Sequence, residues 1–325
     1  MIKVGIAGAA GYTGGELLRL LLRHPDVHIA FAHSNSQAGK PVSDIHQDLA
    51  GDTGLHFTGD WQHDIDVLFL CVGHGDARKL LETVPFPDHV KIIDLSQDFR
   101  LKAQRTSGSR TFVYGLPELN KEAIKTAAAI ANPGCFATAL QLGLLPLAAG
   151  GFCGKVYATG ITGATGGGMS LTPSGHFAWR ANNIQAYKSL THQHMAETAE
   201  SLQQLSPGMP ATAISFIPWR GDFTRGIFVS QQLETGIPLG RLQELYEAYY
   251  AGHPFTVVSK EPIHLKQVVN TNKCLIQVEQ HKGQTVIHTA IDNLLKGASG
   301  QAVQNMNLLF GLPEKAGLNL KAGYF

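Results

Sequence analysis

Cysteine is scarce in this chain of 325 residues, and none of its cysteines form a Cys-x-x-Cys pair. A disulfide framework or a zinc ribbon needs clustered cysteines. Neither of these is expected, and no metal site is predicted. A cysteine with a functional role should therefore act as a free thiol. The four cysteines are Cys71, Cys135, Cys153 and Cys274.

The chain also lacks a charge excess, because 26 basic residues face 25 acidic ones. Nucleic acids and anionic membranes attract proteins through an excess of positive charge, so neither is an expected partner. Glycine, proline and charged residues interrupt every apolar run before the roughly 18 residues that span a bilayer. The first residues carry no basic and apolar leader, so we expect a cytoplasmic protein.

The first half alternates short apolar runs with helical patterns, which is typical of a parallel sheet with crossover helices. A leucine-rich helical pattern at 16–23 stops at His24-Pro25, as helices tend to do before proline. This half is therefore predicted to have an α/β fold. Its predicted strands are residues 3–7, 27–32, 67–72, 90–94 and 128–131.

After about Cys135 longer strand-like runs alternate with amphipathic helical segments, which indicates an α+β domain. A helix following Leu294 has apolar residues at helical spacing and is expected to pack back onto the first domain. The strands predicted in this half are residues 214–217, 226–233, 274–279 and 285–291.

A glycine-rich segment, G-x-x-G-x-x-G, follows the first predicted strand and opens the leucine-rich helix. Glycines there permit a tight turn and let a pyrophosphate approach the N–H groups of the helix N-terminus. The spacing departs from G-x-G-x-x-G, and the alternative is a turn without a ligand. Because strand, turn and helix agree, we predict a dinucleotide site formed by Gly8, Gly11, Tyr12, Thr13 and Gly14.

The segment after the second predicted strand indicates which dinucleotide binds. An acidic residue there would bind the ribose 2′-OH of NAD, but no Asp or Glu occurs between Val27 and Lys40. Ser34, Ser36 and Lys40 instead offer hydroxyls and a cation suited to a 2′-phosphate. We therefore predict NADP; the alternative is a polar loop without this role.

The segment Asn132-Pro133-Gly134-Cys135 joins a small-residue strand to an apolar helix. Cys135 is predicted to occupy the first helical turn, where the helix dipole and N–H groups favour the thiolate, the form that attacks acyl carbons. The other cysteines have the surroundings of small buried hydrophobic residues. Cys135 is therefore the predicted nucleophile.

Taken together, the chain resembles the N-acetyl-γ-glutamyl-phosphate reductase family, relatives of the aspartate-semialdehyde and glyceraldehyde-3-phosphate dehydrogenases. The resemblance spans essentially the whole sequence. It rests on Tyr12-Thr13-Gly14-Gly15-Glu16, Asp94-Leu95-Ser96 with Asp98-Phe99-Arg100, Tyr114-Gly115-Leu116-Pro117-Glu118, Asn132 to Cys135, Thr162-Gly163-Ala164-Thr165-Gly166, His192-Gln193-His194 with Glu197, and Asp292-Asn293-Leu294 with Lys296-Gly297-Ala298-Ser299-Gly300-Gln301.

The resemblance implies a Rossmann domain for NADP at 1–134, completed by 293–325, and a GAPDH-like α+β domain at 135–292 for catalysis and oligomerisation. It implies a homo-oligomer, a dimer or a tetramer. The implied reaction belongs to arginine biosynthesis: an acyl phosphate acylates Cys135, and NADPH reduces the thioester to a semialdehyde. Gly163, Gly166 and Asn293 then belong to a second loop region at the cofactor.

The family-like His-x-His-x-x-Glu segment supplies either His192 or His194 as the acid/base partner of the thiol. Two residues apart, they diverge on a helix and share a face on a strand, so both stay open and His192 is preferred. A solvated histidine pair and a metal site are the alternatives.

Recognition of the substrate's carboxylate and phosphate calls for guanidinium groups. Arg225 is the first choice, and Arg100 and Glu197 are further predicted substrate residues. The segment from Pro218 to Ile227 departs from the family pattern at Trp219 and Arg220. An N-succinyl in place of an N-acetyl cap is therefore an alternative, with Arg220 for the extra carboxylate. Aminoadipyl-phosphate or aspartate-semialdehyde chemistry, and a non-catalytic NADP-binding regulator, also stay open.

Overall fold

The computed structural model describes residues 1–324, which form two compact units. The first unit comprises Met1–Pro133 with Ala298–Asn319, and the second comprises Gly134–Gly297 with the segment from Leu320 onward. Gly134 and residues 293–297 and 320–324, all predicted with the first domain, thus group with the second unit. The assignment of separate functions to the two domains stays a prediction.

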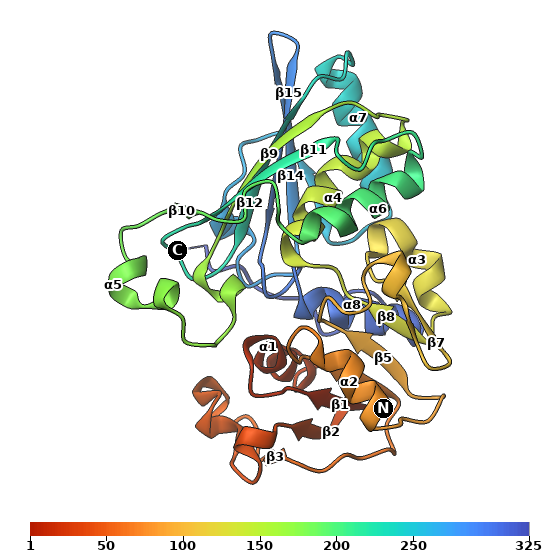
Figure 1. The fold of residues 1–325 in the computed structure, drawn as a ribbon, viewed down its shortest axis with the longest axis vertical. Coiled ribbons are helices and arrows are strands. Elements are labelled where there is room, and N and C mark those ends of the chain that lie inside the picture. The colour runs from red at the N-terminus through yellow and green to blue at the C-terminus, as the bar shows by residue number, and fades with distance from the viewer. Residues whose placement is uncertain (325) are drawn as a thin grey trace. The chain divides into compact units, whose positions relative to one another are not determined.

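A mostly parallel sheet forms the centre of the first unit (Figure 1). Its strands are β1 (Ile2–Ala7), β2 (Val27–His33), β3 (Phe57–Thr58), β4 (Val67–Leu70), β5 (Lys91–Asp94), β6 (Thr106–Ser107), β7 (Arg110–Tyr114) and β8 (Ala129–Ala131). They run in the order β3-β2-β1-β4-β5-β8-β7-β6, and only β6 and β7 pair antiparallel. The order 3-2-1-4-5 is that of a Rossmann fold, which confirms the predicted fold class.

The helices of the first unit are α1 (Tyr12–Leu21), α2 (Asp76–Thr83), α3 (Pro117–Lys125) and α8 (Ser299–Leu309). Helix α8 contacts α1 and α3, although almost 300 residues separate it from α1. Its Asn305 donates to Gly115 O at 2.8 Å and to Asn132 Oδ1 at 3.1 Å. The predicted helix after Leu294 therefore packs on the first unit, as expected.

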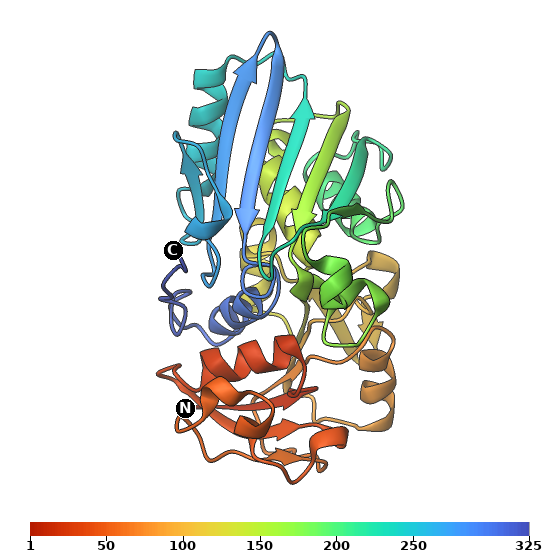
Figure 2. The same ribbon diagram turned by 90° about the vertical axis from the view of Figure 1, so that its left-hand side faces the viewer.

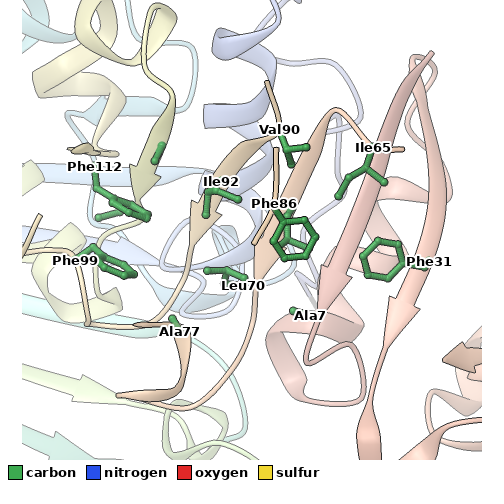
Figure 3. Close-up of a cluster of buried hydrophobic side chains, with 13 residues drawn as sticks. Ala7, Phe31, Ile65, Leu70, Ala77, Phe86, Val90, Ile92, Phe99 and Phe112 are labelled. Carbon is green, nitrogen blue, oxygen red and sulfur yellow. The ribbon is translucent and has the colours of Figure 1, made fainter. Parts of the chain in front are cut away.

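Apolar side chains fill one side of the Rossmann sheet. Figure 3 shows this cluster, which runs from Phe31 across Leu70 and Ile92 to Phe99 and Phe112. The rings of Phe99 and Phe112 stack with centroids 4.0 Å apart. Burying such side chains yields roughly 25 cal/mol per Å² of apolar surface, so this cluster is a main source of stability for the unit.

The second unit contains a seven-stranded mixed sheet. Its strands are β9 (Val156–Thr162), β10 (Gln185–Ala186), β11 (Ile214–Arg220), β12 (Ile227–Leu233), β13 (Thr256–Ser259), β14 (Cys274–His281) and β15 (Gln284–Ile291), in the order β10-β11-β9-β12-β15-β14-β13. Its helices are α4 (Cys135–Ala149), α5 (Phe177–Arg180), α6 (His194–Leu205) and α7 (Leu239–Tyr250). Helices α4, α6 and α7 cover one face of this sheet, and Figure 2 looks onto its other face.

Helix α4 is buried on all sides, as a helix with apolar residues around its whole circumference should be. Its interior contains Pro146, which has no N–H to donate to the Leu142 carbonyl four residues earlier. The hydroxyl of Tyr250, on α7, donates to that carbonyl instead. Cys135 therefore stands at the end of a helix that is firmly held in the core.

Each strand predicted from the sequence lies where it was expected, with ends that differ by up to three residues. Six further strands were not predicted: β3, β6 and β10 are two residues long, and the apolar runs of β7, β9 and β13 are short or interrupted by polar residues or glycine. Among the described residues, no helix is both long and apolar enough to cross a bilayer.

Candidate active site

The glycine-rich turn of the first unit connects β1 to α1, as predicted. Gly8 has φ +75, and a Cβ there would lie 2.3 Å from Cys71 O. A Cβ on Gly14 would lie 2.6 Å from Gly8 O, whereas Gly11 has open space to 3.6 Å. Gly11 caps α1 without a side chain, so the N–H groups of the first turn, at Tyr12 and Thr13, face no capping group. This geometry suits the pyrophosphate of a dinucleotide.

The residues after β2 also have the chemistry predicted for NADP. Ser36 is exposed within the short helix η1 (Asn35–Gln37), and Lys40 Nζ donates to Gln37 Oε1 at 3.0 Å. Ser34 is buried, and its N–H donates to Thr58 O at 2.9 Å. Hydroxyl and ammonium groups, with no acidic residue in the segment that follows β2 up to Lys40, fit a 2′-phosphate better than a free 2′-OH.

Cys135 is the first residue of α4 and is half-buried, which confirms its predicted place in the first helical turn. The N–H of Gly134, directly before it, donates to Glu197 Oε2 at 3.1 Å. A Cβ on Gly297 would lie 2.8 Å from the Cys135 Cβ, so this glycine makes room for the cysteine. The surroundings of the thiol are thus built from segments far apart in the sequence.

Helix α6 brings the second histidine and the glutamate to this turn. His194 begins the helix, and its Nε2 lies 3.8 Å from Glu197 Oε1. Since the other oxygen of Glu197 accepts the Gly134 N–H, the carboxylate lies between the imidazole and the turn that presents Cys135. Glu197, predicted to touch substrate, is itself buried at 4 % exposure.

His192 has different surroundings. Its ring packs edge-on against Phe136, Phe216 and Tyr187, with centroid distances of 5.6, 5.8 and 5.7 Å. Its Nδ1 accepts the N–H of His194 at 3.3 Å. Burial, aided by the charge of Lys188, lowers the pKa of His192 to about 4, so this imidazole is neutral at physiological pH.

Tyr187 lies beside Arg220 in this part of the site. The sequence pointed to Arg220 but not to Tyr187. The Arg220 guanidinium lies 4.5 Å from the centroid of the Tyr187 ring. Burial, and next the negative charge of a Cys135 thiolate, raise the pKa of Tyr187. Tyr187 therefore lies close to both the cysteine and the arginine. It belongs to an irregular segment without periodicity, so no sequence signal marked it.

A second arginine lies beside Arg220. Ser174, Trp179, Arg180 and Arg220 are among the residues that line a pocket. Burial and the positive charge of Arg220 lower the pKa of Arg180, and Arg220 Nη1 donates to Ser174 Oγ at 2.8 Å. Two guanidinium groups lining one pocket repel each other and favour an anion between them.

The remaining predicted residues of the second unit lie in loops that hydrogen bonds connect to one another. Arg225 binds Asp292 through two hydrogen bonds of 3.0 and 3.1 Å. Asn293 accepts the N–H of Gly226 at 2.7 Å and donates to Thr165 Oγ1 at 3.0 Å. Gly163 and Gly166, predicted to cradle cofactor, lie at the helical turn η5 (Ala164–Gly167), where these bonds fix the loop.

Arg100 belongs to the first unit and is buried at 6 % exposure. It donates to Asn132 O at 2.9 Å and to Leu95 O at 3.0 Å. These bonds hold the strand end that precedes Cys135 in the sequence. A substrate role for Arg100, as for Arg225, stays a prediction. Within residues 1–324 no three His, Cys, Asp or Glu side chains are grouped so that they could hold a metal ion.

Two protein-family models match this chain. The model described as the NAD binding domain of semialdehyde dehydrogenase matches residues 3–127, and that described as its dimerisation domain matches residues 135–293. Together they account for most of the chain.

Similar full-length proteins carry one name, N-acetyl-gamma-glutamyl-phosphate reductase. The proteins of Christiangramia forsetii and Bacteroides thetaiotaomicron are each 52% identical over 326 and 327 residues, and that of Flavobacterium johnsoniae is 49% identical over 326 residues. Each alignment covers 100% of both chains.

Solved structures share the fold at low sequence identity. Aspartate semialdehyde dehydrogenase II of Vibrio cholerae matches with a TM-score of 0.73 at 18% identity, covering 96% of this chain and 98% of its own. The aspartate semialdehyde dehydrogenase of Francisella tularensis gives 0.71 at 16% identity, covering 95% and 100%. At this identity the likeness establishes the fold alone.

Proposed function

The chain belongs to the N-acetyl-γ-glutamyl-phosphate reductase family, and on this premise we propose that it reduces N-acetyl-L-glutamyl 5-phosphate to N-acetyl-L-glutamate 5-semialdehyde and phosphate, using NADPH, in the cytoplasm. The reaction is a step of arginine biosynthesis. The observation that carries the proposed mechanism is the setting of Cys135, a half-buried thiol at the start of α4 beside the Glu197–His194 pair.

The first step is acyl transfer. The Cys135 sulfur attacks the acyl carbon of the substrate, the carbon–oxygen bond to phosphate breaks, and phosphate leaves with the bonding electrons. The product is a thioester on Cys135. A thiolate at a helix N-terminus is suited to this attack, since the dipole and the N–H groups of the first turn stabilise its charge.

The second step is reduction. When bound, NADPH supplies the hydride that reduces the thioester carbonyl. Hydride addition leaves a tetrahedral alkoxide on Cys135, which takes up a proton to become the thiohemiacetal. When the hydroxyl gives that proton back, the carbon–sulfur bond breaks with its electrons on sulfur, which releases the aldehyde and restores the thiolate of Cys135. The Gly8-to-Gly14 turn would hold the pyrophosphate, and Ser34 and Ser36 the 2′-phosphate. The loop of Gly163, Gly166 and Asn293 would border the cofactor.

Of the two histidines, we assign the acid/base role to His194, in place of the His192 preferred from sequence. A carboxylate 3.8 Å away stabilises a protonated His194, which can then pair with the thiolate and donate the proton. His192, with a pKa of about 4, carries no charge at neutral pH. Its aromatic surroundings and its bond to the His194 N–H suit a positioning role.

The oligomer is proposed to be a dimer or tetramer formed through the second unit. The family model for residues 135–293 bears the description of a dimerisation domain. On β9 and β11, Tyr157 and Ile217 are 61% and 39% exposed. Trp219 lines a pocket with Phe228 and Ile161. Apolar side chains gathered on one sheet face are typical of interfaces between subunits.

A second candidate substrate carries a succinyl instead of an acetyl cap, and the pair of arginines favours it. An acetyl group has no charge, whereas a succinyl cap ends in a carboxylate that Arg180 and Arg220 could bind in their pocket. Comparing kcat/KM for the two capped substrates, in wild type and in Arg220→Ala, tests this. A succinyl preference that Arg220→Ala abolishes supports it; an acetyl preference that Arg220→Ala leaves unchanged rejects it.

The test of the proposed function is the reverse reaction, in which N-acylglutamate semialdehyde reduces NADP and phosphate takes up the acyl group. We expect Cys135→Ala to be inactive and His194→Asn to lose about 10²- to 10⁴-fold in kcat, with a smaller loss in His192→Asn. Mass spectrometry with an acyl phosphate analogue should find the adduct on Cys135 alone. A turnover that persists in Cys135→Ala would refute the proposed thiol mechanism. No adduct and no turnover in a protein that binds NADPH would favour a non-catalytic regulator.

A further inference from the structure

A buried histidine of the first unit, which the proposed reaction does not use, contacts the dinucleotide turn. His46 lies between the short helices η2 (Val42–Asp44) and η3 (Gln47–Leu49) and is 6 % exposed. Its Nε2 is 2.9 Å from the carbonyl oxygen of Ala9. Because a carbonyl oxygen only accepts, the ring nitrogen is the donor. Ala9 is part of the turn itself, one residue after Gly8.

The ring of His46 also takes the space beside Gly15, in the first half of α1. A Cβ on Gly15 would lie 2.4 Å from His46 Cε1 and 2.7 Å from Nδ1. On its other side the ring meets Phe57 edge-on at a centroid distance of 6.1 Å. The imidazole is therefore packed between the start of α1 and β3, with little freedom to turn away from Ala9.

The segment that carries His46 has a second attachment to α1. Arg19 Nε and Nη2 donate to the two carboxylate oxygens of Asp48, both at 2.6 Å. A forked pair of this kind fixes orientation as well as distance. Arg19 and Gly15 lie one helical turn apart, so the segment 42–49 is held along the same face of α1.

Turns made of glycine are flexible, and a ligand that orders them loses part of its binding free energy to that ordering. A donor that holds one carbonyl of the turn reduces this loss. The Ala9 carbonyl is fixed towards His46, while the N–H groups of Gly8 and Ala9 donate to His33 O at 3.1 and 3.0 Å. Both the N–H and the carbonyl of Ala9 are thus held before any ligand arrives.

We propose that His46 is a positioning residue for dinucleotide binding: by holding the Ala9 carbonyl it sets the turn in the form that receives the pyrophosphate. The inference rests on the proposed use of NADPH and extends it to a residue outside the turn. Since NADP and NAD share the pyrophosphate, His46 should support both equally, unlike the residues that contact the 2′-phosphate.

The experiment measures the Kd of NADPH and of NADH by quenching of protein fluorescence, without substrate, in four variants. His46→Ala removes the ring, His46→Phe keeps a ring beside Gly15 without a donor, and His46→Gln places an amide N–H near the position of Nε2. His56→Ala, an exposed histidine ten residues away, is the matched control. Urea unfolding of each variant without cofactor shows how much of each protein is folded.

We expect His46→Ala and His46→Phe to raise both Kd values about tenfold, the loss of roughly one net hydrogen bond. His46→Gln should recover most of the affinity, and His56→Ala should match wild type. Equal Kd values for wild type and a folded His46→Phe would overturn the inference and leave the proposed function intact. A wild-type protein that binds neither dinucleotide would instead refute the proposed function.

Discussion

Replacing Tyr250 by phenylalanine should destabilise the protein because of a proline 104 residues earlier. Pro146 cannot donate to the Leu142 carbonyl within α4, and the Tyr250 hydroxyl takes over that role. Leu142 is fully buried, so water cannot replace the lost donor. Cys135, the proposed nucleophile, begins the same helix, yet lies two helical turns before Leu142, outside the region that the change affects.

The expected loss of unfolding free energy follows from the Leu142 carbonyl, which Tyr250→Phe leaves without a hydrogen-bond donor. A buried acceptor left without a partner costs about 1–3 kcal/mol, so Tyr250→Phe should lower the unfolding free energy by about 2 kcal/mol. In a Pro146→Ala background the alanine N–H can donate to Leu142 in the ordinary helical pattern. There Tyr250→Phe should cost less than about 1 kcal/mol, which gives a coupling of about 1 kcal/mol or more.

Urea unfolding followed by circular dichroism measures the four proteins of this cycle. Tyr246→Phe is the matched control, because Tyr246 on the same helix donates to Gly143 O, a carbonyl whose helical donor, the Leu147 N–H, is present. Its cost should be the same with and without Pro146→Ala. If Tyr250→Phe lowers the free energy of unfolding equally in both backgrounds, the Tyr250 hydroxyl does not compensate for the N–H that Pro146 lacks. The kcat of Tyr250→Phe should equal that of wild type.

Three further predictions concern the two units separately. Burial raises the pKa of Asp94 from 3.8 to about 7, so between these pH values the folded protein keeps a proton that the unfolded chain loses. The free energy of unfolding should therefore fall as pH rises from about 4 to 7, and urea unfolding of Asp94→Asn should lack this dependence on pH. Gly8→Ala should abolish NADPH quenching of fluorescence and cost roughly 2 kcal/mol or more, whereas Gly39→Ala, with a similar φ of +85 but open space, should bind normally. Glu197→Gln keeps an acceptor for the Gly134 N–H but removes the charge beside His194. Its kcat/KM should fall at least about tenfold at an unchanged urea midpoint, and a kcat/KM equal to that of wild type would reject the role of that charge.

Features that depend on neighbouring residues could be predicted from the sequence. The alternation in β1, the glycines from Gly8 to Gly14 and the leucines of α1 are local signals, and together they indicate a Rossmann unit with a dinucleotide turn. The Pro133-Gly134-Cys135 segment likewise indicates a thiol at a helix start. These predictions needed no partner from elsewhere in the chain, because strand, turn and helix geometry depend on adjacent backbone and side-chain preferences.

The composition of the site depended on contacts between distant segments. Glu197 reaches Gly134 across 63 residues of sequence, and the pairing of two residues so far apart leaves no periodicity that one sequence displays. The roles proposed for His192 and His194 rest on packing, which lowers the pKa of the first and places a carboxylate beside the second. Such properties arise only when the chain is packed, since desolvation and proximity have no counterpart in the unfolded sequence.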